Sequence, residues 1–126
     1  LFTKKRNQIA KINNKNFKNI KNLKIPSKSK KVSHAYHLYT ILIDFKKFNF
    51  TKNKFMKFLH DNKIGSQVLY IPVFLQPYFK RKYNYDANKF PVSMKYYEQA
   101  LSIPIFYSLK KIEQNFVIKK IKELLS

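Results

Sequence analysis

The 126-residue chain contains no cysteine and only one glycine, Gly65. Without cysteine, the chain can form neither a disulfide nor a thiolate metal site, which suits a reducing compartment. A single glycine also excludes glycine-rich phosphate loops and the Gly-x-Ser-x-Gly turn of serine hydrolases. No apolar run reaches the roughly 18 residues that a membrane-spanning helix needs. The absent motifs therefore remove the commonest nucleotide-binding, hydrolase and membrane classes.

Acidic residues are also scarce: six Asp and Glu stand against 27 Lys and Arg, which gives a formal net charge of +21. The carboxylates are scattered along the chain: Asp44, Asp61, Asp86, Glu98, Glu113 and Glu123. No pair of them has a spacing that suggests general acid–base catalysis. No histidine or carboxylate cluster has the spacing of metal ligands.

The positive charge comes almost entirely from lysine, because Arg6 and Arg81 are the only arginines. Specific nucleic-acid sites favour arginine, whose planar group grips bases and phosphates with two hydrogen bonds. Lysine, asparagine, isoleucine and phenylalanine are spread evenly, which is typical of a translated AT-rich genome. A basic module that binds nucleic acid or another polyanion remains an alternative.

The hydrophobic fraction of 44% and the aromatic fraction of 17% predict one packed domain. Hydrophobic periodicity and turn residues indicate eight segments. They are a helix over 1–23, a strand over 34–45, a helix over 51–62, a strand over 66–71, an irregular aromatic segment over 78–91, a helix over 93–101, an edge strand over 102–106 and a helix from residue 108. This order predicts an α/β fold, with helices flanking a short, mostly antiparallel sheet.

Two further predictions concern burial. His37 lies inside the strand over 34–45, so we expect a core histidine with a satisfied hydrogen bond. The last helix is expected to bury one apolar stripe: Leu109, Ile112, Phe116, Val117, Ile121 and Leu124.

The stretch Ile64–Arg81 combines the single glycine with two of the five prolines, Pro72 and Pro77. The prolines stop a regular ladder, and Gln67, Tyr70, Gln76 and Tyr78 are spread along the stretch. It is either a stiff surface connection or a loop that carries a binding site, because recognition groups concentrate on such loops.

Several different short motifs follow one another along the chain in a fixed order. They are His37-Leu38-Tyr39, Ile64–Val73, Leu75-Gln76-Pro77-Tyr78, Phe90-Pro91, Tyr96-Tyr97-Glu98, Leu101–Phe106 and Gln114–Ile118. In this order they resemble the C-terminal part of the DegT/DnrJ/StrS sugar aminotransferases, over nearly the whole chain. The block Tyr-Ile-Pro-Val-x-Leu-Gln-Pro-Tyr, residues 70–78, is most similar to the branch of pseudaminic acid biosynthesis.

The resemblance implies the small C-terminal domain of an aspartate-aminotransferase-like, fold type I enzyme. Residues 1–25 would be the tail of the interdomain helix and residues 26–126 the small domain, with the large cofactor-binding domain absent. It further implies a cytoplasmic homodimer that uses pyridoxal 5′-phosphate (PLP) to move an amino group from glutamate to a 4-keto-6-deoxy UDP-sugar.

In that family a lysine of the large domain holds the cofactor. No lysine of this chain lies in a segment that matches the family's lysine motif, so we assign no catalytic or cofactor-binding residue and expect the 126 residues alone to be inactive. The resemblance implies sugar-nucleotide contacts, by hydrogen bonding and shape, from six residues: Tyr70, Ile71, Pro72, Gln76, Tyr78 and His37. Leu69 and Phe74 stand where that branch usually has histidine, which makes this loop less polar.

Two other functions compete with this prediction. One is the basic polyanion-binding module, which a salt titration would reveal. The other is a structural piece that stabilises a partner subunit. An isolated small domain should also expose the apolar faces that meet the large domain, around Ile9, Ile12 and the last helix, and we therefore expect poor solubility.

Overall fold

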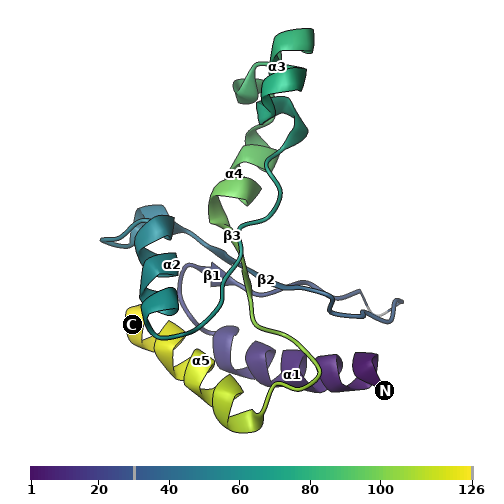
Figure 1. Ribbon diagram of the computed structural model, residues 1–126, viewed down its shortest axis with the longest axis vertical. Helices are drawn as coiled ribbons and strands as arrows, with labels where there is room; N and C mark the ends of the chain where they lie inside the picture. The colour runs from purple at the N-terminus through teal and green to yellow at the C-terminus, as the bar shows by residue number, and fades with distance from the viewer. Residues whose placement is uncertain (30, 126) are drawn as a thin grey trace.

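The computed structural model describes residues 1–29 and 31–125 of the chain (Figure 1). A body made of a small sheet and helices α1, α2 and α5 carries a projecting segment that holds α3 and α4. We call residues 68–99, which form this segment, the arm. None of the described helices is long and apolar enough to cross a membrane.

The sheet has three antiparallel strands in the order β1-β2-β3. Strand β1 (Leu23–Lys24) pairs with β2 (Tyr39–Ile43), and β2 pairs with β3 (Ala100–Ile103). In this register Leu23 lies opposite Ile43, and Ile41 lies opposite Leu101. The central strand thus joins the two halves of the chain, and the predicted α/β fold with a short antiparallel sheet is confirmed.

Helices α1 (Phe2–Phe17), α2 (Lys52–Asp61) and α5 (Lys111–Leu125) complete the core of the body. Alternate residues of β2, namely Tyr39, Ile41 and Ile43, are fully buried, whereas Thr40 and Leu42 between them are only half-buried. The buried core also includes Phe17 from α1, Phe55 and Leu59 from α2, Leu101 from β3 and Ile121 from α5. One face of the sheet therefore carries the core, and the other face looks toward the arm (Figure 1).

Helix α2 matches the predicted helix over 51–62 to within one residue at each end. Thr51 precedes the helix, and its side chain accepts a hydrogen bond from the Lys54 backbone N–H at 3.3 Å. At the helix exit the residue with a left-handed φ, of 61°, is Lys63 and not the nearby glycine, Gly65. The Ile64 N–H donates to the Leu59 carbonyl at 2.9 Å and closes the turn.

The predicted strand over 34–45 is wrong in its first half. Tyr36 has a left-handed φ of 46°, which is incompatible with extended pairing, so β2 begins only at Tyr39. The same kink turns His37 outward: its side chain is exposed and is not the core histidine that the alternation predicts. Tyr36 itself is buried and stacks near Tyr39, with ring centroids 6.2 Å apart.

The predicted strand over 66–71 is reduced to one bridge, in which Gln67 and Ser102 exchange two backbone hydrogen bonds at 2.9 and 3.1 Å. On one side of this bridge, Pro104 follows β3 and has no N–H to extend the pairing. On the other side, the chain leaves the sheet for the arm (Figure 1). Residues 66–71 are therefore mostly a connection that leads from the body to the arm.

Two burial predictions near the ends of the chain are wrong in part, although Leu109, Val117 and Ile121 of the predicted stripe are buried as expected. Ile9 is buried in the core and does not offer a free apolar face. In α5 the buried side chains are Gln114, Val117, Ile118, Ile121 and Leu125. Ile112 and Phe116, expected in the core, are instead exposed. The helix is rotated, so that the face that carries Gln114, Val117 and Ile118 packs into the body.

A buried polar network fastens α5 to α1. The Gln114 side-chain amide donates to the Ile9 carbonyl at 2.9 Å and to Asn13 Oδ1 at 2.8 Å. Nearby, the Tyr39 hydroxyl donates to Asn14 Oδ1 at 2.6 Å, and burial raises the pKa of this phenol well above its usual range. Buried polar groups that are paired in this way fix one relative placement of the two helices.

Replacing Gln114 by leucine is expected to lower the free energy of unfolding by about 2 kcal/mol, because it leaves the Ile9 carbonyl and Asn13 buried without their donor. Chemical denaturation of Gln114→Leu and of the wild-type chain measures this loss. Asn115→Leu, at the exposed neighbouring position, is the matched control and should stay within about 0.5 kcal/mol. Equal stabilities of Gln114→Leu and wild type would contradict a role for the network.

Candidate functional site in the projecting arm

The arm contains more helix than its sequence predicts. A short 3-10 turn (Val73–Leu75) leads into α3 (Pro77–Tyr83), and a second turn (Ala87–Lys89) leads into α4 (Pro91–Gln99). Pro77 and Pro91 occupy the first positions of their helices, where the fixed φ of proline is helical and the missing N–H costs nothing. The segment over 78–91, expected to be irregular, is therefore largely helical.

Stacked aromatic rings hold the arm together. Phe74 and Phe90 stack with centroids 4.5 Å apart and an interplanar angle of 10°. Tyr85 meets Phe90 edge-on at 5.9 Å and stacks on Tyr83 at 5.5 Å. Phe74 is buried at 7% exposure, yet it does not belong to the main core of the body. The arm thus has a small core of its own, and Phe74, at a position of histidine in the resembled branch, serves as packing here.

Two contacts tie the arm to α2 and to the turn before it. The Lys52 ammonium donates to the Tyr97 carbonyl at 2.9 Å and lies 5.4 Å from the centre of the Tyr97 ring. Partial burial there lowers the pKa of Lys52. An exposed ion pair, Lys46–Glu98 at 3.7 Å, lies nearby and contributes little. Lys52 is therefore the main polar link between α2 and α4.

Five of the six predicted site residues lie along the arm. Tyr70 is 97% exposed, and Ile71 and Tyr78 are about half exposed. The Gln76 side-chain amide donates weakly to the Ile71 carbonyl at 3.4 Å, and the Tyr78 hydroxyl accepts from Lys82 at 3.3 Å. These side chains are presented to the outside and contribute little to the packing of the chain.

A small apolar cavity of about 320 Å³ lies beside this loop. Tyr70 and Pro72 line it, together with five residues that sequence reasoning did not select as site residues: Leu69, Val92, Ser93, Tyr96 and Tyr97. Leu69 is the second position at which the resembled branch has histidine. The loop and α4 thus form one concave surface, which hydrophobic periodicity alone could not reveal because α4 pairs with a segment about twenty residues away.

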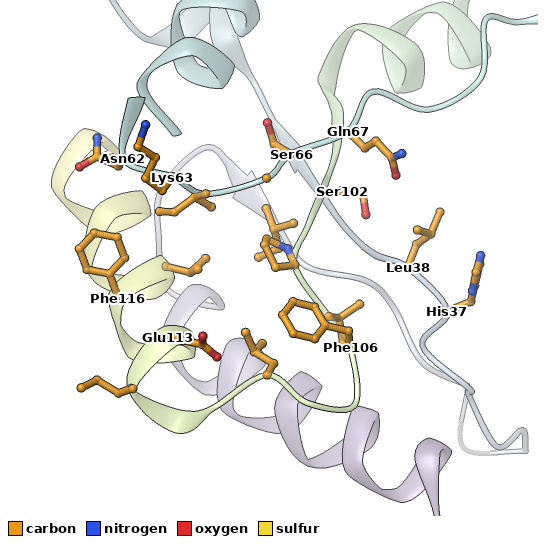
Figure 2. Close-up of a pocket in the computed structure, with 18 residues that line it drawn as sticks. His37, Leu38, Asn62, Lys63, Ser66, Gln67, Ser102, Phe106, Glu113 and Phe116 are labelled. Carbon is orange, nitrogen blue, oxygen red and sulfur yellow. The ribbon is translucent and has the colours of Figure 1, made fainter. Parts of the chain in front are cut away.

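His37 is separate from the other five candidates. It lines a larger groove on the body, of about 800 Å³, which none of the other five lines. Figure 2 shows α5 with Phe116 and Glu113 on one side of this groove, Leu38 and His37 on the opposite side, and residues 62–67 along the top. The structure therefore places five predicted residues on one surface and His37 on another.

The described residues do not form a site for PLP. Such a site needs a lysine directed at the cofactor, a cradle for its phosphate and an acidic partner for its ring nitrogen. None of the lysines that the structure describes is buried, and the one that lines the large groove, Lys63, is exposed. The only carboxylate in that groove, Glu113, accepts the Lys110 N–H at 2.7 Å as a helix cap. The cofactor of an aminotransferase would have to be held elsewhere.

Comparisons with known proteins agree with the fold. The chain is 32% identical over its full length to protein MJ1066 of Methanocaldococcus jannaschii, of which it spans 33%. It is 34% identical over 92 residues to the spore coat polysaccharide biosynthesis protein SpsC of Bacillus subtilis and covers 24% of that protein. The chain thus spans a third or less of the curated relatives that it matches.

Solved structures show the same fold. PseC of Helicobacter pylori, an aminotransferase involved in pseudaminic acid biosynthesis, superimposes with a TM-score of 0.87 at 22% identity, over 98% of this chain and 33% of PseC. The PLP form of the sugar aminotransferase Spr1654 of Streptococcus pneumoniae gives a TM-score of 0.85 at 20% identity, over 98% of this chain and 31% of that one. The model of the DegT/DnrJ/EryC1/StrS aminotransferase family matches residues 1–122. The chain belongs to the DegT/DnrJ/EryC1/StrS aminotransferase family.

Proposed function

We propose that this chain is the C-terminal small domain of a sugar-nucleotide aminotransferase, with residues 1–25 as the tail of the helix that joins two domains. The complete enzyme would be a cytoplasmic homodimer and would transfer an amino group from glutamate to a 4-keto-6-deoxy UDP-sugar for a surface glycan such as pseudaminic acid. Support comes from the family match over residues 1–122 and from the fold shared with PseC.

The arm is the observation that carries this proposal. It is prefolded by its aromatic cluster, but it displays Tyr70 at 97% exposure beside an apolar cavity. An exposed aromatic side chain that borders an apolar cavity is available to contact a ligand there. We infer that the arm reaches over the sugar nucleotide and supplies shape and hydrogen bonds.

PLP would be held by the lysine-bearing part of the enzyme, since the residues described here do not fit it. When bound, the cofactor supplies the electron sink for amino transfer. The role of this chain is to position the substrate. The Tyr70 ring can cover an apolar face of the sugar or base, and the Gln76 amide can both donate to and accept from a hydroxyl. Ile71, Pro72 and Tyr78 would shape the surroundings.

A chimera tests this role. The residues of PseC that superimpose on this chain are replaced by the chain itself, which gives the PseC chimera. In it, Tyr70→Ala is expected to raise KM for the UDP-sugar about tenfold, because a lost aromatic contact costs about 1–1.5 kcal/mol. The KM for glutamate should stay unchanged, and steady-state kinetics measure both values.

Two further variants sharpen this test. Tyr70→Phe keeps the ring and separates its contribution from that of the hydroxyl. Tyr107→Ala removes a half-exposed ring of the body and should leave KM for the sugar nucleotide unchanged. An unaltered KM in Tyr70→Ala would remove Tyr70 from the substrate site.

The alternative function, binding of a polyanion, has one observation in its favour. Lys82 lies 5.5 Å from the centre of the Tyr78 ring and 5.4 Å from that of Tyr83, next to Lys80 and Arg81. From a charge of +21 we expect only weak binding to single-stranded DNA, which disappears as salt rises toward about 0.2 M. A salt titration followed by fluorescence anisotropy measures this, and tight binding that persists at physiological salt would favour the alternative.

A further inference from the structure

We propose that the large groove of the body is the docking surface for the lysine-bearing part of the aminotransferase, the portion that relatives possess and this chain does not match. This inference rests on the proposed function and deepens it. It assigns a partner surface to residues that the arm does not use: Leu38, Gly65, Phe106, Ile112 and Phe116.

The walls of the groove carry exposed apolar side chains. Ile112 is 76% exposed, and Leu38, Phe106 and Phe116 are each about 40% exposed. Ile112 and Phe116 stand one helical turn apart on α5, so both extend along the same edge of the groove (Figure 2 shows Phe116). Several exposed apolar side chains on the walls of one hollow of about 800 Å³ are typical of a covered interface and not of free surface.

Gly65 supplies a second and independent observation. It lines the groove, and a Cβ built on it would meet no atom within 4 Å. Its φ is not positive, so the backbone conformation does not require glycine either. Neither strain nor packing within this chain therefore explains its single glycine. A polypeptide that approaches closely from outside the chain does explain it.

Length and charge identify the occupant. The chain spans 33% of MJ1066 and 33% of PseC, so most of such an enzyme is available to cover the groove. A second isolated copy of these 126 residues is a poor occupant, because each copy alone carries a charge of +21 and the two would repel. Exposed Lys63 at the rim favours a partner that brings a carboxylate.

Thiol labelling can test the docking surface without measuring activity. In MJ1066, the residues that match this chain are replaced by the chain, which gives the MJ1066 chimera. Because this chain has no cysteine, Ile112→Cys gives the 126 residues a single thiol, and its modification in either protein is followed by the mass of the peptide that carries it. Its labelling rate should be at least about tenfold slower in the chimera than in the isolated chain, as expected for a site that must open before it reacts.

Two variants serve as controls. Val32→Cys, at a residue that is 55% exposed and does not line the groove, should label at equal rates in both proteins. Gly65→Ala should leave the Tm of the isolated chain unchanged but lower that of the chimera by about 2–4 °C. This contrast separates an effect on docking from an effect on the fold of the chain.

Several results would overturn the proposal. The first two are equal labelling rates of Ile112→Cys in the chimera and in the isolated chain, and an equal change in Tm from Gly65→Ala in both. The other two are a chimera that does not fold, and a dimer of the isolated chain in which the Ile112→Cys thiol is protected. Failure of the proposed function alone gives another pair of results: the Ile112→Cys thiol is protected in the MJ1066 chimera, but the PseC chimera transfers no amino group. Transfer by the PseC chimera with Ile112→Cys freely labelled in the MJ1066 chimera would keep the function and remove this surface.

Discussion

The isolated chain, mixed with PLP, glutamate and a UDP-linked 4-keto-6-deoxy sugar, is expected to form no amino sugar above the uncatalysed rate. Enzymes accelerate their reactions by at least about a million-fold, so the difference from a complete aminotransferase is very large. The physical reason is that no lysine described in the chain is buried against a cofactor pocket and no phosphate cradle is present among the described residues.

Product formation by mass spectrometry and the visible absorbance of PLP check this result. With the isolated chain, the spectrum of PLP should remain that of the free cofactor, while complete PseC under the same conditions gives the positive control. Amino transfer by the 126 residues alone would show that they hold a cofactor site that the structure does not reveal.

Phe55→Ala is expected to lower the free energy of unfolding by about 3–5 kcal/mol, which is a large share of the stability of a small domain. Phe55 is fully buried on α2, and the rings of Phe45 and Phe50 lie 5.8 and 6.0 Å from its own. Removing the ring leaves a cavity under the helix that also carries Lys52, the polar link to the arm. Urea denaturation followed by circular dichroism measures the loss.

Phe116→Ala is the matched control, because the same ring is removed from a half-exposed position on α5. Its cost in the isolated chain should stay below about 1 kcal/mol. Similar losses for the two variants would mean that Phe55 does not anchor the core as described.

The parts of the fold that the sequence predicts are those in which local signals and tertiary packing agree. Helix α2 has a capping threonine and a regular apolar face, and both appear in the structure. Strand β2 alternates as expected over Tyr39–Ile43, but Tyr36 adopts a left-handed conformation that alternation cannot reveal. The exposed position of His37 follows from that one kink.

The candidate site was harder to predict because it depends on contacts between distant segments. Phe74 stacks on Phe90 across the arm, and this contact holds together helices that lie in a segment expected to be irregular. In α5 the apolar residues occupy more than one face, so periodicity does not decide which of them are buried. Gln114, which is polar, is buried, whereas Ile112, which was expected in the core, is exposed.

The most direct test of the proposed function is amino transfer by the PseC chimera. With glutamate and the UDP-linked 4-keto-6-deoxy sugar, the chimera is expected to form the 4-amino sugar nucleotide, and Tyr70→Ala should raise its KM for that sugar nucleotide. A chimera that folds and binds PLP but transfers no amino group to the sugar would contradict the proposal that this chain supplies the substrate-positioning part of a sugar-nucleotide aminotransferase.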